Sequence, residues 1–353
     1  MNTAMTHLIR SVFFLALLGM AGPAPAAVIM LYHHVSEDTP ASTSVTPEQF
    51  AGHLDRLEKE GFEVVRLDEL VERVEAGLDP HKKVVSITFD DAYESILEKG
   101  IPMMEERGWP ATVFVATEPV KNARRGMMTV EEVRDLHDRG HLMVNHSHTH
   151  HHMVRRRDGE SERAWLQRLE QDTRKAQQLL TRWLGEEPPR YFAYPYGEHE
   201  PKVRNMLREK GYRGFSQRSG AVDRNVNWMD VPRIPVNRQF AGWNGLGDKV
   251  RALPMKIQDV KPDNSITDQA RPQFTIQVPE GWRAGALNCF ARGEPAEIRR
   301  QTRGGVDHVT VRPAVDLSPG RTLVNCTASA GGGRFYWYSH LWMKRDNGQW
   351  YAE

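Results

Sequence analysis

The sequence predicts an α/β domain followed by a smaller all-β domain. Up to about residue 239, apolar runs of strand length alternate with helical segments of about 10–15 residues, which is typical of a mostly parallel sheet or barrel wrapped by helices. After about residue 245 the helical periodicity disappears. Short apolar runs follow one another and are separated by glycine and proline residues. This second pattern is typical of a small antiparallel β-sandwich. We therefore expect domains at 28–250 and 262–353.

Length and charge exclude several classes of protein. The chain has 353 residues, enough for about two domains, and its hydrophobic content of 39% excludes a disordered chain. Lys and Arg total 47 against 46 for Asp and Glu. A general binder of nucleic acid or of an anionic membrane normally carries a basic excess, which this chain lacks.

Residues 1–27 have the pattern of a cleaved secretory signal peptide. Arg10 precedes the apolar run 11–20, and the small residues of 21–27 follow it. The apolar run is about half the ~20 residues that a membrane-spanning helix needs, so an uncleaved anchor is the weaker alternative. We expect cleavage after Ala26 or Ala27, and an exported protein that is periplasmic or extracellular and has no transmembrane segment.

The first domain is predicted to consist of strand and helix pairs. Short apolar runs predict strands, and apolar residues at a spacing of about 3.6 predict helices. The expected strands are 28–34, 64–67, 84–89, 111–116 and 141–145, and the expected helices are 47–60, 68–76, 93–107, 129–139 and 160–184.

The second domain is predicted from apolar runs separated by turns. The expected strands are 274–278, 287–290, 308–311, 322–326 and 335–342. Two cysteines in an exported protein predict a disulfide bond between Cys289 and Cys326, which would staple the sandwich. The aromatic cluster 335–338 with Trp342 fits either a core or a sugar-stacking surface, and in a sandwich the core is the more frequent role.

Two adjacent carboxylates, Asp90 and Asp91, follow the predicted strand 84–89. In parallel sheets and barrels, functional sites gather at the C-terminal ends of the strands. Two neighbouring carboxylates can divide the chemistry, because one can bind a cation while the other accepts a proton. An Asp pair after a strand is also a common helix N-cap.

A cluster of histidines predicts a metal site. Five histidines lie within residues 146–152. His146 and His150 can present two imidazoles to one ion, and one carboxylate would complete a three-ligand site with open positions. The alternative is a solvated polyhistidine loop, which fits some of the five histidines but not all of them. The ligand types favour zinc, and cobalt, nickel and iron are also compatible.

An aromatic segment, Arg190 to Gly197, surrounds a proline and ends at a glycine. Such a segment can supply a ring wall for a sugar and a backbone N–H for an oxyanion. It is equally compatible with core and turn.

In this order, the three motifs resemble those of the polysaccharide deacetylases of the NodB-like carbohydrate esterase family. Thr88-Phe-Asp90-Asp91 resembles the family's first motif, which implies that Asp90 is the general base and Asp91 a metal ligand. The segment from Gly140-His141 to His150 resembles the second motif, His-Ser/Thr-x-x-His, which implies the metal role for His146 and His150.

The resemblance extends over about residues 28–240 and implies a distorted (β/α) barrel. The opening Leu31-Tyr-His-His-Val and the later Val45-Thr-Pro-Glu-Gln-Phe are similar to the secreted subgroup that includes the biofilm poly-N-acetylglucosamine deacetylases. The pattern His148-Thr149-x-x-His152 also fits the short second motif. The upstream Gly140-His141 and Asn145 favour the register with His146 and His150.

Two positions depart from the family's pattern. Ala193 stands where the third motif usually has an arginine that orients the base, and Arg233 is our candidate for that role. No histidine lies between His199 and His308 to supply the acid of the last motif, Leu-x-His. The general acid is therefore open between His33, His34 and a metal-bound water.

The resemblance implies a metal-dependent hydrolase that removes N-acetyl groups from a polysaccharide containing N-acetylglucosamine and releases acetate. The expected glycan contacts come from His33, His34, Tyr194, Pro195 and Tyr196, with the Tyr196 backbone N–H at the oxyanion. We expect an N-acetylated glycan as the partner, and we expect no binding of nucleic acid. The alternatives are a weak or inactive glycan-binding or scaffold protein of an exopolysaccharide system, and a different metal-dependent amidohydrolase.

Overall fold

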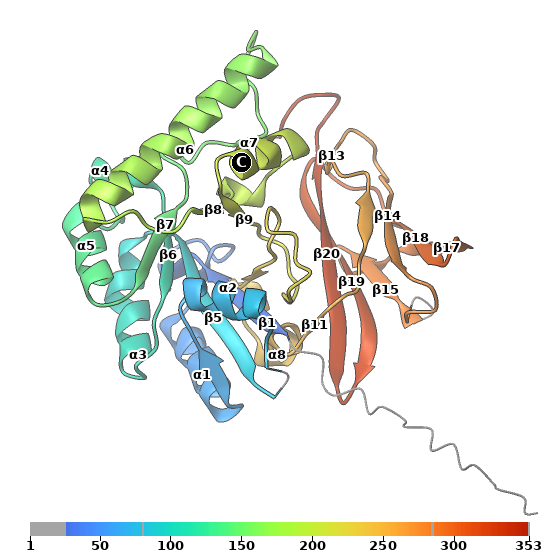
Figure 1. Cartoon of the computed structure of the whole chain (residues 1–353), viewed down its shortest axis with the longest axis horizontal. Coiled ribbons are helices and arrows are strands. Elements are labelled where there is room, and N and C mark those ends of the chain that lie inside the picture. Colours follow the sequence, from blue (N-terminus) through green and yellow to red (C-terminus); the bar gives the residue numbers. More distant parts are fainter. Residues whose placement is uncertain (1–25, 80, 284–285, 352–353) are drawn as a thin grey trace, which may run out of the picture.

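The structure, a computed structural model, describes residues 26–351 except 80 and 284–285 (Figure 1). The expected signal peptide, 1–27, lies almost wholly outside the described residues. Among the helices of the described part, none combines the length and the apolar character that crossing a membrane requires.

A parallel sheet forms the centre of the N-terminal region. Its strand order is β10-β1-β5-β6-β7-β8-β9, and β4 pairs with β5 off this path. The strands are β1 (Ala27–Tyr32), β4 (Phe62–Val64), β5 (Lys83–Asp91), β6 (Thr112–Val115), β7 (Leu142–Asn145), β8 (Tyr191–Ala193), β9 (Arg213–Phe215) and β10 (Ile234–Pro235). The strands β1, β6 and β7 are buried along their whole length, which explains why they appear in the sequence as continuous apolar runs. A short pair, β2 (His34–Val35) and β3 (Ser44–Val45), lies apart from this sheet.

Helices cover the outside of the sheet (Figure 1). The α-helices are α1 (Pro47–Lys59), α2 (Leu67–Ala76), α3 (Ile101–Glu105), α4 (Thr117–Lys121), α5 (Val130–Asp138), α6 (Glu162–Leu184), α7 (Pro201–Glu209) and α8 (Trp243–Val250), with short turns η1 (Ile96–Gly100), η2 (Pro195–Gly197) and η3 (Arg238–Phe240). Thr46 and Thr129 begin α1 and α5 with capping boxes, and Gly185 ends α6 in the left-handed conformation. These signals explain why the boundaries of these helices were predictable.

The segment 93–107 differs from the single helix that the sequence predicts. It forms a π-helical turn, η1, and then the short α3, which has Pro102 in its first turn. Proline has no backbone N–H to continue an upstream ladder and is tolerated at a helix start, so the chain changes helix type just before it.

The C-terminal region is rich in β-strands, as expected. One sheet has the order β11-β20-β19-β15-β16 with β13 beside β20, and a second has the order β12-β14-β18-β17. The strands are β11 (Leu253–Pro254), β12 (Asp259–Lys261), β13 (Ile266–Thr267), β14 (Phe274–Pro279), β15 (Asn288–Ala291), β16 (Glu294–Pro295), β17 (Glu297–Arg303), β18 (Val306–Arg312), β19 (Gly320–Gly331) and β20 (Arg334–Lys344). Apolar side chains from both sheets, including Phe274, Val309, Val324 and Trp342, share one buried cluster. Strand β17 was missed because it is charged and mostly exposed, so it lacks an apolar alternation.

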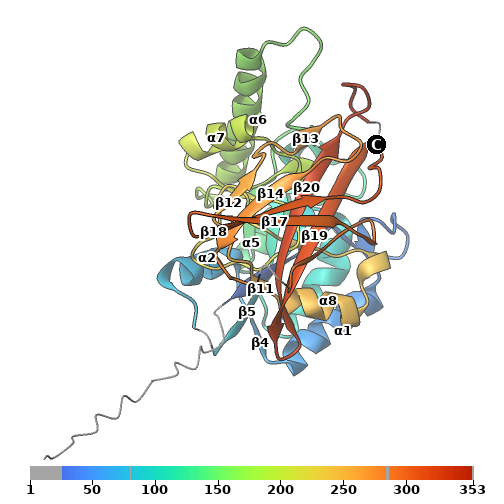
Figure 2. The same ribbon diagram turned by 90° about the vertical axis from the view of Figure 1, so that its right-hand side faces the viewer.

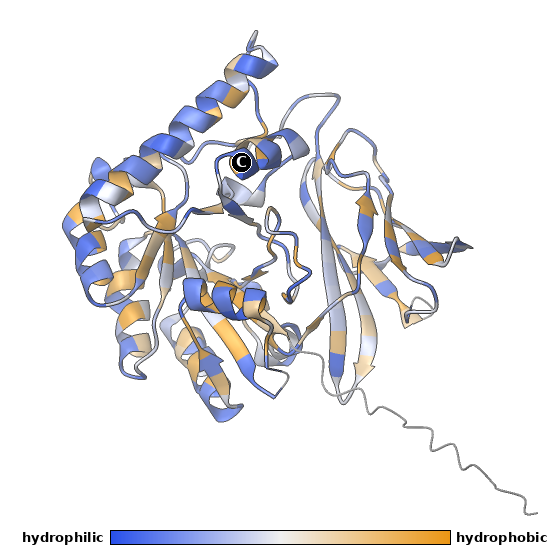
Figure 3. Cartoon of the chain, in the orientation of Figure 1, coloured by the Kyte–Doolittle hydropathy of each residue, from blue (hydrophilic) through white to orange (hydrophobic). Residues whose placement is uncertain are grey.

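The β-rich region packs directly on the α/β region (Figure 2). Strand β20 pairs with β11, and Trp337 of β20 packs against the main core of the α/β region. Tyr336, Tyr338 and Trp342 instead join the β-rich cluster, so the aromatic strand serves as core on both sides. Figure 3 shows apolar residues concentrated on the central strands of the α/β region and many polar residues on the helices around them.

The predicted disulfide bond joins Cys289 of β15 to Cys326 of β19, which lie opposite each other in the antiparallel pair. Both cysteines are buried. Replacing both with serine should lower the unfolding free energy of the β-rich region by about 2–4 kcal/mol, because the bond closes a loop in the unfolded chain. Denaturant unfolding measures the change. Reduced wild type should match the variant, and equal midpoints for the oxidised wild type and the variant would contradict the expectation.

Candidate metal centre and active site

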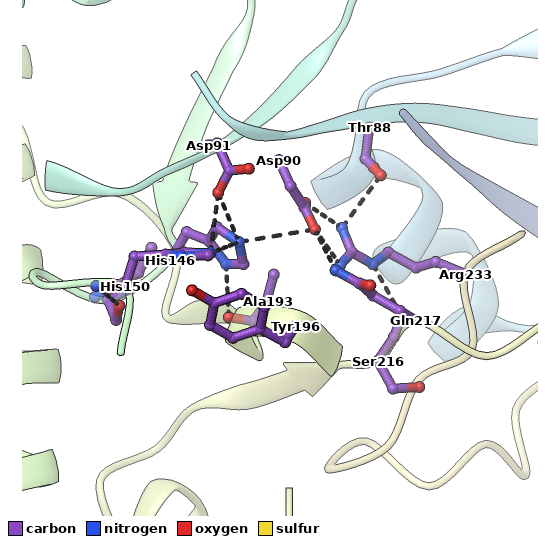
Figure 4. Close-up of polar contacts among 12 residues, drawn as sticks. Thr88, Asp90, Asp91, His146, His150, Ala193, Tyr196, Ser216, Gln217 and Arg233 are labelled. Atoms are coloured by element: carbon purple, nitrogen blue, oxygen red, sulfur yellow. Dashed lines mark hydrogen bonds and ion pairs between the residues drawn. The ribbon is translucent and has the colours of Figure 1, made fainter. Parts of the chain in front are cut away.

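Strand β5 delivers Asp90 and Asp91 to the C-terminal edge of the parallel sheet (Figure 4). Asp90 is fully buried and Asp91 nearly so. Asp91 and the following Ala92 have φ angles of 78° and 70°, so the chain leaves the strand through the left-handed region. The two carboxylates face different neighbours: Asp90 faces Arg233, and Asp91 faces His146 and His150.

Three ligand atoms converge beside Asp91. Asp91 Oδ1 lies 3.0 Å from His150 Nε2 and 3.3 Å from His146 Nε2, and the two imidazole nitrogens are 3.2 Å apart. Asp91 Oδ1 is buried and has no hydrogen bond of acceptable geometry. An unsatisfied buried carboxylate oxygen facing two imidazole nitrogens fits a divalent cation of the first transition row. Among the described residues, this trio is the group of His, Cys, Asp and Glu side chains arranged to hold a metal.

The contacts of His146 and the ionisation of Asp91 suit a ligand role. His146 Nδ1 lies 2.9 Å from the carbonyl oxygen of Ala193, to which it can donate, and this leaves the Nε2 lone pair for the cluster. Burial opposes ionisation of Asp91, but the neighbouring His150 and His146 hold its pKa well below the usual value. The carboxylate is therefore ionised as a metal ligand must be.

Hydrogen bonds fix the loop that carries the histidines. Ser147 and His150 have φ angles of 67° and 53°, in the left-handed region. Asn145 Oδ1 accepts from the Ser147 N–H at 2.8 Å, and Ser147 Oγ accepts from the His150 N–H at 2.9 Å. From α6, Asp172 accepts the N–H of His148 at 2.8 Å and that of Thr149 at 3.2 Å. This role of Asp172 could not be predicted from the sequence, because an acidic residue in a helix is ordinarily solvated.

The other histidines of the cluster face different neighbours. His148 Nδ1 lies 2.9 Å from Thr117 Oγ1, and His152 Nδ1 lies 2.7 Å from Glu198 Oε2. His151 is exposed. The alternative register, His148 with His152, is therefore not the one that the structure brings to Asp91.

Arg233 lies against Asp90, although 143 residues separate them. Its Nη1 and Nη2 donate to the two oxygens of Asp90 at 2.6 and 2.9 Å, and Arg233 is also fully buried. Gln217, which sequence reasoning missed, donates to Asp90 Oδ2 at 3.4 Å. Burial raises the pKa of Asp90, but the charges of Arg233 and His146 outweigh it and lower the pKa. Asp90 Oδ2 lies 3.8 Å from His146 Nε2, beside the ligand trio.

In the aromatic segment 190–197, Tyr194 and Pro195 lie in the core, whereas Tyr196 lies beside the site. Tyr194 is fully buried and its hydroxyl donates to the Met229 carbonyl at 2.8 Å, and Pro195 is buried too. The expectation that these two side chains contact a glycan is wrong, because both point into the fold. Tyr196 is half-buried, and its ring centroid lies 4.8 Å from that of His150. Tyr196 also has a φ of 60°, a conformation that costs a bulky residue about 1–3 kcal/mol.

Gly197 is required by the same turn. Its φ is 70°, and a Cβ there would lie 2.7 Å from Gln217 Cβ. A side chain would therefore displace the segment that contacts Asp90.

His33 and His34 lie near the site at the end of β1, and both are half-buried. Burial lowers the pKa of His33, and the charges of Asp91 and Asp90 oppose this effect without cancelling it. The ring of His34 stacks on Tyr93 at 3.6 Å, and burial, together with His33, lowers its pKa to about 4.

Comparison with known proteins agrees with this geometry. Residues 77–215 match the family model of the polysaccharide deacetylases. A poly-β-1,6-N-acetyl-D-glucosamine N-deacetylase of Staphylococcus aureus (strain MSSA476) is 26% identical over 230 residues, which cover 62% of this chain and 78% of that protein. These matches confirm the resemblance found in the motifs.

Solved structures share the fold of the α/β region. The deacetylase PplD of Streptococcus pyogenes, solved in complex with acetate, has a TM-score of 0.56 at 18% identity and covers 64% of this chain and 99% of its own. IcaB from Ammonifex degensii has a TM-score of 0.54 at 24% identity, covering 64% of this chain and 97% of its own. The parallel sheet with its helices therefore matches the (β/α) fold expected for residues 28–240.

Proposed function

We propose that this chain, which carries a polysaccharide deacetylase domain, is a metal-dependent hydrolase that removes N-acetyl groups from an N-acetylglucosamine polymer and releases acetate. One observation carries the proposal. Arg233 donates hydrogen bonds to both oxygens of Asp90, a buried and ionised carboxylate that lies next to three converging ligand atoms. A scaffold protein that had lost catalysis would have no need for this costly arrangement of buried charges.

Asp91, His146 and His150 would hold the metal ion. When bound, a divalent cation supplies a Lewis acid that polarises the acetamide carbonyl and favours ionisation of water. Two imidazoles and one carboxylate suit zinc first, and cobalt, nickel and iron are compatible with the same donors.

The other residues supply proton transfer and orientation. Asp90 is the general base, because its Oδ2 lies beside the ligand trio and its depressed pKa keeps it ionised. Arg233 orients the carboxylate by donating a hydrogen bond to each of its oxygens. The Tyr196 backbone N–H donates to the oxyanion that forms at the former carbonyl oxygen.

His33 and His34 are the candidates for the group that gives a proton to the departing amine. Burial is the largest influence on both: it lowers the pKa of His33 against the charges of Asp91 and Asp90, and it lowers the pKa of His34 to about 4. His34 also stacks on Tyr93, and these two rings would form part of the wall that a sugar ring contacts.

The substrate proposal is supported by the similarity to the Staphylococcus aureus enzyme, whose name gives a β-1,6-linked N-acetylglucosamine polymer. We also propose that the chain is exported and acts on such a biofilm glycan, with residues 262–353 forming a β-sandwich accessory domain. Acetate release from β-1,6-linked oligomers, chitin oligomers and peptidoglycan, measured on metal-loaded protein, tests activity and substrate together. Stoichiometric metal without acetate from any of the three would favour the glycan-binding alternative.

Replacing Arg233 with methionine should shift the pH dependence of acetate release. In the wild type, Arg233 lowers the pKa of Asp90 against the effect of burial. Without it burial dominates, the pKa rises, and the base is lost as pH falls through the raised value. We expect kcat/KM to fall by about 10²-fold or more at neutral pH and to recover partly at alkaline pH.

A second, half-buried pair supplies the control. Arg218 donates to Asp230 at 2.9 Å, and the other partner of this carboxylate is His199 rather than Arg233. Arg218→Met should affect stability without moving the acidic limb of the pH profile. An unmoved limb in Arg233→Met would contradict the orienting role.

A further inference from the structure

The turn that carries Tyr196 is held from outside its own domain. Arg321 in β19 lies 125 residues further along the chain, and its Nη1 donates to the Tyr196 carbonyl. The same guanidinium lies 5.7 Å from the Tyr196 ring centroid. One cation of the β-rich region therefore contacts both the backbone and the ring of this residue.

The Tyr196 ring is also held by a histidine. The ring of His152 stacks on Tyr196 with centroids 3.9 Å apart and an interplanar angle of 10°. His152 Nδ1 lies 2.7 Å from Oε2 of Glu198, which is fully buried.

Tyr351, at the C-terminal end of the described residues, contacts the same glutamate. The hydroxyl of Tyr351 donates to Oε1 of Glu198. Arg155 in turn donates to the Tyr351 carbonyl at 3.2 Å and lies 4.8 Å from its ring centroid. Burial raises the pKa of Glu198, but its bonds with His152 and Tyr351 outweigh this and lower it. Glu198 is therefore ionised, and its two carboxylate oxygens link His152 to Tyr351.

These contacts matter because Tyr196 borders the ligand trio (Figure 4). Its ring centroid is 4.8 Å from that of His150, and its φ of 60° persists only where the surroundings impose it. The Tyr196 carbonyl belongs to the peptide group that follows the one carrying the Tyr196 N–H, so contacts with the carbonyl and the ring restrain the direction of the N–H through the φ and ψ angles of Tyr196.

We propose that Arg321 and Tyr351 are positioning residues for deacetylation, through which the β-rich region fixes the Tyr196 turn at the oxyanion. This inference rests on the proposed deacetylase function. It makes the β-rich region part of the active-site wall, which differs from the role of a tethered glycan-binding module.

Steady-state kinetics on metal-loaded, full-length protein tests the proposal with a β-1,6-linked N-acetylglucosamine oligomer. In Arg321→Met we expect kcat to fall about ten-fold with KM nearly unchanged, because complete loss of an oxyanion donor costs about 10²–10³-fold and a displaced donor costs less. Arg321→Lys keeps a cation and a donor and should recover part of the loss. Tyr351→Phe should lower kcat by a smaller factor.

Arg283 offers a matched control within the same region. It donates to the Ser329 carbonyl at 2.8 Å and lies 5.6 Å from the Tyr336 ring centroid, the same two kinds of contact away from the site. Arg283→Met should keep the wild-type kcat. Equal kcat values for the Arg321→Met and Arg283→Met variants would overturn the proposal.

Hydrogen exchange gives a readout that does not depend on turnover. The backbone amides of 194–199 should exchange faster in Arg321→Met than in wild type, and should be unchanged in Arg283→Met. Unchanged exchange in Arg321→Met would also overturn the proposal. A wild-type protein that binds metal but releases no acetate would instead refute the deacetylase function itself, so the two failures are distinguishable.

Discussion

Replacing Asp90 with asparagine is expected to abolish acetate release while metal remains bound. Asparagine has nearly the shape of aspartate but cannot take a proton from the attacking water, and a positioned base contributes about 10²–10⁴-fold. The proposed ligand atoms belong to Asp91, His146 and His150, so this substitution leaves the proposed metal site unchanged. Acetate release and metal content, measured on one preparation, give both results.

The control for this variant must account for the loss of a buried charge. Asp90→Asn leaves the guanidinium of Arg233 without its anionic partner, which costs about 3–5 kcal/mol when such a pair is buried. Asp230→Asn removes the anionic partner of Arg218, in a half-buried pair whose carboxylate contacts His199 and not Arg233. If Asp230→Asn kept acetate release and Asp90→Asn lost it, instability would not explain the loss. Wild-type turnover by Asp90→Asn would refute the assignment of the base.

The α/β region was predictable because its signals are local. Capping residues such as Thr129 begin helices, and the fully buried strands β1 and β6 stand out as continuous apolar runs. The exceptions have physical causes. One predicted helix contains a π-helical turn before Pro102, and the charged strand β17 is exposed and carries no apolar pattern.

The centre of the site was predictable because its chemistry is concentrated in short segments. Asp91, His146 and His150 come from two motifs and meet within ligand distance. Arg233 was a candidate for orienting Asp90 only because Ala193 stands where the third motif of the family usually has an arginine. Tyr194 was misplaced, because the sequence does not show that its side chain turns into the core.

The supporting groups were not predictable, because they come from distant segments with ordinary local patterns. Gln217 and Asp172 reach Asp90 and the histidine loop through tertiary packing. Arg321 lies in a strand of a different region and contacts the Tyr196 turn only in the folded chain. Their roles follow from where the fold places them.

Replacing His146 with alanine is expected to remove both the metal and acetate release. His146 contributes one of three converging ligand atoms, and its loss should weaken metal binding by more than the ~10–100-fold that losing an outer-shell partner costs. Equilibrium dialysis against zinc, with unfolding followed in parallel, separates loss of the ligand from loss of the fold.

His148 is the matched control, because it is a buried histidine of the same loop. Its imidazole contacts Thr117 and lies 3.6 Å from a carboxylate oxygen of Glu118, facing away from Asp91. His148→Ala should therefore keep metal and acetate release. The opposite pattern, with metal lost in His148→Ala and retained in His146→Ala, would mean that the second motif runs from His148 to His152. Because the two registers share no histidine, this pair of variants decides between them.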